Sequence, residues 1–220
     1  MHEAKRRRVP AMPPEDRRAA LVEACVPLLY EHGLDISTKQ IAGAAGVAEG
    51  TIFGVFENKN ALLIAALVRA LDPQQTLDAL AAIDRSLPLR ERLTIAADLI
   101  QRRFSENARL VGAARTLSMA AGNHEEAAAN MARSRKMLEA AITEVIEPDA
   151  VALRRSPQAT ARLLLLFAGA NTYGPFADPV NFNAAELVSL LLDGLLVVEH
   201  SSGLVLPRIG AWDDNENGDE

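Results

Sequence analysis

Residues 37–59 combine a helix-start signal, a glycine turn and several small side chains within a short segment. Ser37-Thr38-Lys39-Gln40 is a capping box, in which the Ser37 hydroxyl accepts from the Gln40 amide while the Gln40 side chain reaches back, so it predicts the start of a helix. Gly46 predicts a tight turn after that helix, because glycine takes a left-handed backbone conformation without a Cβ clash. A second short helix follows, and small residues around the turn let the two helices cross closely. The segment is predicted to be a helix-turn-helix, whose second helix fits a major groove.

Helical periodicity extends over nearly the whole chain, and no strand pattern survives comparison with it. The predicted fold class is therefore all-α, with an N-terminal three-helix helix-turn-helix module followed by a larger helical domain. Pro27 lies inside the first helix, where it removes a backbone hydrogen bond and predicts a kink. The expected helices span Glu15–Glu31, Ser37–Ala45, Glu49–Phe56, Lys59–Leu71, Gln74–Ile83, Leu89–Phe104, Glu106–Ala121, His124–Ile146, Pro157–Tyr173 and Ala184–Ser201.

Composition narrows the class of protein. Hydrophobic residues make up 49% of the 220 residues but aromatic residues only 4%, which favours helices packed through small and aliphatic side chains. The single cysteine, Cys25, excludes an intramolecular disulfide, and no apolar run approaches the roughly 18 residues of a membrane span. We therefore expect a cytoplasmic protein without a membrane partner. The expected divisions are a flexible basic arm at 1–14, the helix-turn-helix domain at 15–72, a helical effector-binding and dimerisation domain at 73–202, and a disordered acidic tail at 203–220.

The net charge of −6 is distributed unevenly along the chain. Residues 1–72 hold nine basic and nine acidic side chains, whereas residues 211–220 hold five acidic side chains and no base. Most of the excess negative charge thus lies in the C-terminal tail. The acidic total is therefore no argument against a nucleic-acid partner for the N-terminal module.

Three runs within the helix-turn-helix resemble the tetracycline-repressor (TetR) family. They are Thr38-Lys39-Gln40-Ile41-Ala42, Ala45-Gly46-Val47-Ala48-Glu49-Gly50-Thr51-Ile52-Phe53, and Phe56-x-x-Lys59-x-x-Leu62-Leu63, and the resemblance covers about 17–71. It implies a bacterial transcription regulator, usually a repressor, that binds a palindromic operator in double-stranded DNA as a homodimer. It also implies that the C-terminal helices bind a small-molecule effector and the partner subunit.

The resemblance also implies which residues contact DNA. Thr38 and Lys39 open the positioning helix near phosphates, the recognition helix follows, and Lys59 meets the backbone at a helix N-terminus, where amides and charge both favour phosphate. Ala48, Phe53, Gly54 and Val55 depart from the family in lacking a cap or a donor. We therefore hypothesise that a basic arm enters the adjacent minor groove. The predicted DNA-binding residues are Arg6, Arg7, Arg8, Thr38, Lys39, Gly50, Thr51, Phe53, Gly54, Val55 and Lys59.

The last two predicted helices are apolar nearly all round, which favours burial in a two-fold interface between subunits. The predicted interface residues are Leu164, Phe167, Leu191, Leu195 and Val198. The effector is expected to be largely apolar, and its candidate contacts are Phe104, Arg115, Met119, Met131, Asn171 and Tyr173. These side chains have an alternative as ordinary core or surface groups. The four histidines are too dispersed in the sequence to predict a metal site, and we expect no cofactor.

Two other functions are alternatives to DNA binding. An enzyme is not expected, because the sequence contains no Gly-rich phosphate loop, nucleophile elbow or metal-spaced His/Cys set. A helical interaction module, whose helix-turn-helix contacts protein instead of DNA, is the stronger alternative. Gly54 and Val55 keep it open because neither side chain can donate to a base or a phosphate. Exposed acidic Glu49 and Glu57 on the same face would favour it further.

Overall fold

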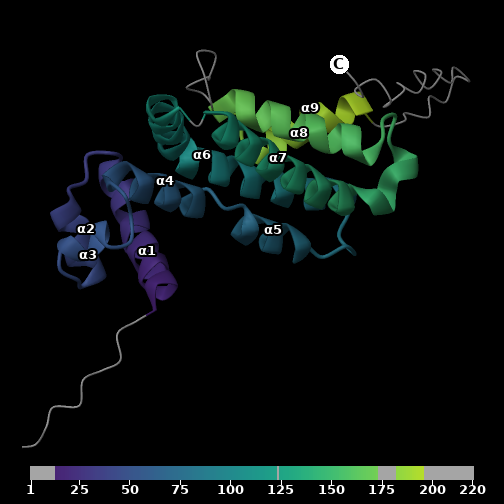
Figure 1. The fold of residues 1–220 in the computed structure, drawn as a ribbon. Helices are drawn as coiled ribbons and strands as arrows, with labels where there is room; N and C mark the ends of the chain where they lie inside the picture. Colours follow the sequence, from purple (N-terminus) through teal and green to yellow (C-terminus); the bar gives the residue numbers. More distant parts are fainter. Residues whose placement is uncertain (1–12, 123, 173–181, 196–220) are drawn as a thin grey trace, which may run out of the picture. The chain divides into compact units, whose positions relative to one another are not determined.

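The computed structural model describes residues 13–122, 124–172 and 182–195, and all regular secondary structure in them is helical (Figure 1). The predicted all-α fold class is confirmed. None of the described helices is both long and apolar enough to cross a membrane. The elements are α1 (Pro14–His32), α2 (Thr38–Ala45), α3 (Gly50–Phe53), α4 (Lys59–Ala70), α5 (Gln74–Ala81), α6 (Leu89–Ala121), α7 (His124–Ile146), the 3-10 helix η1 (Glu147–Ala152), α8 (Pro157–Thr172) and α9 (Ala184–Leu195).

The chain divides into two compact units that are not contiguous in sequence. One comprises residues 1–73 and 106–134, and the other comprises residues 74–105 and 135–220. The sequence predicts a single boundary near residue 72, whereas the structure groups residues 106–134 with the N-terminal helices. The long helices α6 and α7 therefore each contribute residues to both units.

The first unit has its own hydrophobic core. Three residues of α1 spaced four apart, Leu21, Cys25 and Leu29, are buried against α2 and α4. This spacing places them on one face of the helix. Leu110 and Leu117 of α6 complete the same core. Its other buried members are Ile36, Ile41, Ala42, Ile52, Phe56, Leu62, Leu63, Ala66 and Leu67.

Local signals place the ends of several helices where the sequence predicts them. Both bonds of the capping box are formed: Ser37 Oγ accepts from the Gln40 amide at 3.2 Å, and Gln40 Oε1 accepts from the Ser37 amide at 2.8 Å. Asn58 caps α4 by accepting from the Ala61 amide at 2.9 Å. Asn183 caps α9 in the same way. The predicted caps are therefore confirmed. Each one satisfies a backbone donor that the first turn of a helix leaves unpaired.

Two predicted boundaries are wrong. The sequence predicts a break between Phe104 and Glu106, but α6 is one helix of 33 residues. The predicted break falls at a serine and not at a proline or glycine, so the backbone hydrogen bonds of the helix continue through it. The predicted helix over Glu49–Phe56 is assigned as helix only at Gly50–Phe53.

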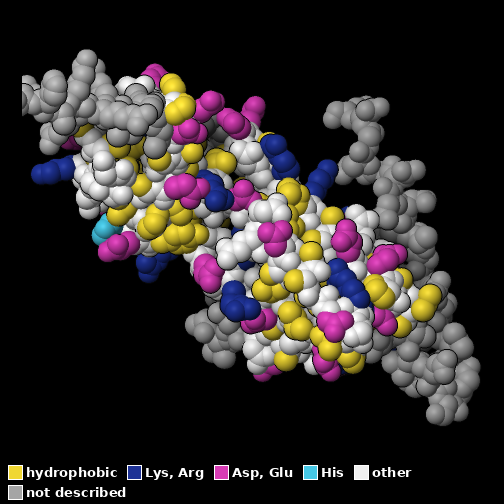
Figure 2. Space-filling model, turned by 90° about the horizontal axis from the view of Figure 1, so that it is seen from below, with side chains coloured by type: hydrophobic (Ala, Val, Ile, Leu, Met, Phe, Trp, Pro, Cys, Tyr) yellow, Lys and Arg dark blue, Asp and Glu magenta, His cyan; other side chains and the backbone are white. Residues whose placement is uncertain are grey.

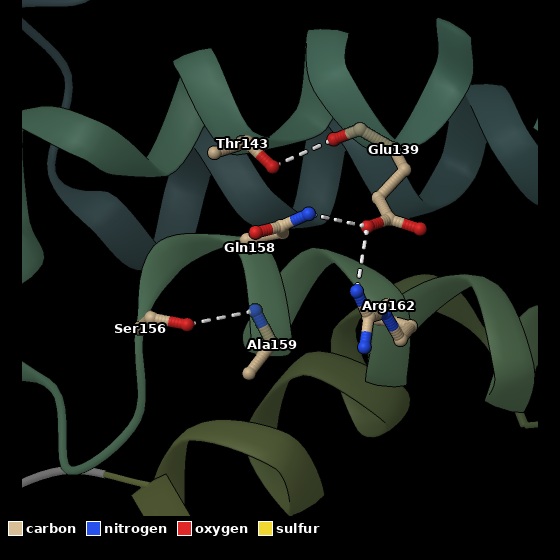
Figure 3. A network of polar contacts seen from close by, with 6 residues as sticks. All are labelled: Glu139, Thr143, Ser156, Gln158, Ala159 and Arg162. Atoms are coloured by element: carbon tan, nitrogen blue, oxygen red, sulfur yellow. Dashed lines mark hydrogen bonds and ion pairs between the residues drawn. The ribbon is translucent and has the colours of Figure 1, made fainter. Parts of the chain in front are cut away.

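In the second unit, α7 and α8 are joined by polar contacts around Glu139 (Figure 3). Its Oε1 accepts from Gln158 Nε2 at 3.1 Å and from Arg162 Nη2 at 3.3 Å. The Thr143 hydroxyl donates to the Glu139 carbonyl at 2.7 Å. The Ser156 hydroxyl accepts from the Ala159 amide at 3.1 Å and caps the first turn of α8. One carboxylate thus links two successive turns of α8 to α7.

The second unit also contains a buried cation. Arg92 of α6 is 1% exposed, and its Nη2 pairs with Asp149 of η1. Its Nη1 donates to the Arg85 carbonyl at 3.4 Å. Among the described residues, Arg92 Nε has no hydrogen-bond partner. Asp149 is therefore the group that compensates the buried charge.

Candidate DNA-binding site

The turn between α2 and α3 sets the geometry of the helix-turn-helix (Figure 1). Gly46 has φ 66° and ψ 30°, the left-handed conformation that the sequence predicts. The Val47 amide donates to the Ala42 carbonyl at 3.0 Å, which pairs one of the last carbonyls of α2. Ile41 of α2 and Ile52 of α3 are completely buried in the unit's core. These two side chains hold both short helices on the core, so the opposite side of α3 faces outward.

The recognition helix is shorter than predicted. Gly54 is the C-terminal cap of α3, and the amides of Val55 and Phe56 both donate to the Ile52 carbonyl, at 3.0 and 2.8 Å. Gly54 and Val55 therefore lie just after the helix instead of on it. The physical reason is the low helix propensity of glycine, together with the burial of Phe56, which draws the chain toward the core. No side chain caps the N-terminus of α3, as expected from Ala48.

The predicted contact residues differ in their exposure. Lys39, Gly50 and Phe53 are exposed, and Phe53 keeps 55% of its surface accessible. Thr51 and Val55 are half-buried, and Val55 packs against the core of its own unit. The apolar surface that α3 offers to a partner is therefore mainly Phe53. The predicted arm residues Arg6, Arg7 and Arg8 lie outside the described residues.

The Thr38 hydroxyl is committed to another residue of the site. Thr38 Oγ1 donates a hydrogen bond to Oε1 of Glu49, the residue immediately before α3. A hydroxyl has a single proton to donate. In this arrangement the hydroxyl proton is not available to the phosphates near which the resemblance places Thr38. The sequence places Glu49 on the face of the helix-turn-helix but does not predict its contact with Thr38, which joins residues of α2 and the start of α3 across the turn.

Lys59 lies at the first position of α4 and is half-buried. Its Nζ donates to the Leu34 carbonyl at 3.5 Å, in the segment between α1 and α2. An ammonium carries further protons for a second acceptor. Its positive charge also partly offsets the effect of burial on Cys25, whose pKa burial raises to about 11.

Two contacts that the sequence did not predict fix the surroundings of the helix-turn-helix. The Arg18 guanidinium lies 4.2 Å from the centre of the Phe56 ring, a cation–π contact between α1 and the segment after α3. The Tyr30 hydroxyl of α1 donates to Asn107 Oδ1 of α6 at 3.0 Å. Both pairs join residues far apart in sequence, so helical periodicity could not reveal them.

Charged side chains of both signs are mixed on the face that Figure 2 shows, where Lys and Arg are interspersed with Asp and Glu. On the helix-turn-helix, Lys39, Glu49 and Glu57 are all exposed. The described part of the site is therefore not a purely basic surface.

The predicted effector contacts do not gather in one unit. Phe104 packs against the core of the second unit, where the Gly169 position of α8 lies close to its ring. Arg115, Met119 and Met131 belong to the first unit and are exposed, Met119 by 67%. The side chain of Asn171 and all of Tyr173 lie outside what the structure describes. Effector binding stays a prediction.

Two predicted interface residues belong to the interior of their own subunit. Leu164 and Leu191 are buried in the core of the second unit, because they lie on the faces of α8 and α9 that meet α6 and α7 residues. They are unavailable to a partner, and this part of the prediction is wrong. Phe167 of α8 is 46% exposed. Leu166, its neighbour in α8, and Leu190 of α9 are also exposed apolar residues. The Leu195 side chain and Val198 lie outside the described residues.

Comparison with known proteins agrees with these features. Residues 21–66 match the family model described as bacterial regulatory proteins, tetR family. Similar solved structures include a TetR transcriptional regulator from Streptomyces coelicolor, with 24% identity, a TM-score of 0.51, and coverage of 81% of this chain and 98% of that chain.

Two further structures have the same fold. A transcriptional regulator from Rhodococcus sp. is 20% identical with a TM-score of 0.55, over 85% of this chain and 100% of that one. A TetR transcription regulator from Haloarcula marismortui is 22% identical with a TM-score of 0.54, over 83% and 99%. The resemblance that the motifs of residues 38–63 predict is confirmed. Residues 21–66, which contain the helix-turn-helix, therefore match the bacterial TetR family of regulatory proteins, and the described fold is that of solved regulators of this kind.

Proposed function

We propose that this protein is a ligand-responsive transcriptional repressor that binds a palindromic operator as a homodimer. The observation that carries the proposal is the helix-turn-helix itself. Ile41 of α2 and Ile52 of α3 are buried in the core of the unit, whereas Gly50 and Phe53 of α3 are exposed. A recognition helix needs this division between a packed face and a face open to a major groove.

Contacts to the DNA backbone come from the helix N-termini. Lys39 is exposed in the first turn of α2, and Lys59 is the first residue of α4. A cation at the positive end of a helix dipole is unfavourable alone, and a phosphate there relieves the repulsion. Base contacts are fewer, and the exposed Phe53 ring is suited to a thymine methyl group.

The basic arm supplies the contacts that α3 lacks, by placing Arg6, Arg7 and Arg8 in the adjacent minor groove. Deleting residues 1–9 and titrating operator DNA at several salt concentrations tests this part. The logarithm of the affinity falls as the logarithm of the salt concentration rises, and each phosphate contact that is lost makes this fall less steep by about 0.9. An unchanged affinity together with an unchanged slope would show that the arm has no role.

Dimerisation and effector response belong to the second half of the chain. Leu166, Phe167 and Leu190 are exposed apolar residues of α8 and α9, which supports a subunit interface there. We propose that an apolar effector favours a dimer whose recognition helices are wrongly spaced for successive major grooves. Effector binding then weakens DNA binding, and DNA weakens effector binding by the same factor.

Selection of genomic DNA fragments with the purified protein tests the proposed function. We expect recovery of a palindrome whose half-sites are separated by about 34–36 Å or a multiple of it. Failure to enrich any DNA over a protein-free control would contradict the proposal. It would favour the interaction module, since Glu49 and Glu57 are exposed beside the recognition helix.

A further inference from the structure

The carboxylate of Glu49 is held in a defined place at the start of the recognition helix. Glu49 has helical backbone angles, φ −55° and ψ −39°, and precedes α3 directly, yet its side chain does not cap that helix. Instead, its Oε1 accepts from the hydroxyl of Thr38, the first residue of α2. The side chain is therefore tied across the turn of the helix-turn-helix, and it remains exposed.

This arrangement leaves hydrogen-bonding capacity unused. An ionised carboxylate is an acceptor only, and its two oxygens offer about four lone pairs. The Thr38 proton occupies one of them at Oε1. No donor in the described part of the chain reaches Oε2 of Glu49. The free oxygen is thus available to an N–H donor from outside the protein.

The positions next to Glu49 have few side chains that could hydrogen-bond to a base edge. Gly50 and Gly54 have no side chain, and Ile52 is completely buried. Phe53 is exposed but apolar, and Thr51 is half-buried. Within the helix and the residues that flank it, Glu49 is the exposed side chain that can hydrogen-bond to a base edge.

A carboxylate distinguishes the four bases by repulsion as well as attraction. In the major groove cytosine presents only its N4 amino donor, whereas guanine presents two acceptors and thymine presents O4. Adenine has an amino donor, but the N7 acceptor next to it repels a second carboxylate oxygen. A fixed carboxylate therefore accepts from cytosine and disfavours the alternatives.

We propose that Glu49 contacts a cytosine in each operator half-site and that Thr38 is the positioning residue for its carboxylate. This inference rests on the proposed function and deepens it, because it names a base pair that the operator must contain. It also accounts for an acidic residue on a surface that approaches phosphates: the charge costs affinity and contributes specificity.

In vitro selection from a random duplex library, with the full chain, tests the proposal. The variants are Glu49→Ala, Glu49→Gln, Thr38→Val and the conservative Thr38→Ser. Glu57→Gln is the matched control, because Glu57 is an exposed acid of the same module with no contact to Thr38. Titration of duplexes that differ at a single base pair then measures the preference of each variant. Melting of each variant followed by circular dichroism confirms that it is folded.

We expect the wild type to select a cytosine at one position of the half-site, preferred over other bases by roughly 5- to 140-fold, the range of a typical single-base-pair mismatch. Glu49→Ala loses this preference and keeps the others. Glu49→Gln shifts it toward adenine, because an amide can donate to N7 and accept from N6 together. Thr38→Val weakens the cytosine preference alone, and Thr38→Ser restores it.

Three outcomes would overturn the inference. If the Glu49→Ala variant keeps every base preference, Glu49 makes no contact that selects a base. If the Thr38→Val variant keeps the cytosine preference, Thr38 does not position the carboxylate. The same loss in Glu57→Gln makes the effect one of charge and not of contact. A wild type that enriches no DNA is a separate result, since it contradicts the proposed function and not only the base preference.

Discussion

Cys25 has no exposed surface in the core of the first unit, and burial raises the pKa of its thiol from 9.0 to about 11. The thiolate is the form that reacts with thiol reagents. We therefore expect Cys25 to be at least roughly 100-fold less reactive in the folded protein at pH 8 than in urea. Labelling with a chromogenic disulfide reagent measures both rates. Fast labelling of the folded protein would contradict this account.

The same shift makes stability depend on pH. Because the folded pKa lies above the unfolded value, the stabilisation is complete below pH 9 and is lost as the pH rises toward 11. The loss amounts to roughly 2–3 kcal/mol for two pKa units. Urea unfolding of the wild type and Cys25→Ala at pH 8 to 11 isolates it. The variant should lose less stability over this interval than the wild type.

The pair formed by Arg92 and Asp149 predicts a non-additive response to mutation. Asp149→Ala leaves a buried guanidinium without its counterion, so the free energy of unfolding should fall by about 3 kcal/mol. Replacing both residues, with Arg92→Met and Asp149→Ala together, removes the charge and should recover most of the loss. Urea unfolding of both variants and of Arg92→Met completes the cycle. Additive effects would show that the two side chains are not coupled.

Among the helices and turns, α2 and the turn that follows it each contain a glycine, and the two have opposite expectations. Gly46 has a positive φ and open space around its Cβ position, so Gly46→Ala should cost about 1–2 kcal/mol through backbone strain alone. Gly43 lies within α2, also with open space, and Gly43→Ala should stabilise by about 0.5–1 kcal/mol. Thermal unfolding compares the two. Equal effects of the same sign would contradict the assigned conformations.

Sequence patterns predicted most of the helices because their end signals are local. The Ser37–Gln40 box, the Asn58 cap and the Gly46 turn depend on residues within a few positions of each other. The break predicted at Ser105 was wrong, because a change in apolar pattern without a proline or glycine does not end a helix. The helix α3 ends earlier than predicted because the low helix propensity of Gly54, a local signal, acts together with the burial of Phe56, which depends on the packing of the whole unit.

The candidate site was predicted only in part, because local patterns reveal positions along a helix but not the contacts between helices. Positions on α2 and α3 follow from motif spacing, but the hydrogen bond between Thr38 and Glu49 depends on how the turn brings two helices together. The contact of Tyr30 with Asn107 joins residues 77 apart, beyond the reach of any periodicity. Leu164 and Leu191 were misplaced because an all-apolar helix does not reveal which side meets its own subunit.

For the protein as a whole, the exposed apolar residues of α8 and α9 lead to a prediction about assembly. Leu190 is 61% exposed, so Leu190→Glu should leave the subunit folded while placing a charge in the proposed interface. We expect the dissociation constant of the dimer to rise at least about tenfold. Sedimentation at several concentrations measures it. Val151→Glu is the control, since Val151 is an exposed apolar residue of η1. A dimer that withstands Leu190→Glu would place the interface elsewhere.

The two leucines that α6 contributes to the N-terminal core have a consequence for synthesis of the protein. Leu110 and Leu117 join a core whose other members end at Leu67. A ribosome adds roughly 5–20 residues per second, so the helix-turn-helix emerges several seconds before its last core residues. During that interval the nascent module exposes the apolar surface that α6 later covers. The core of the helix-turn-helix module is thus completed only after α6 has been translated.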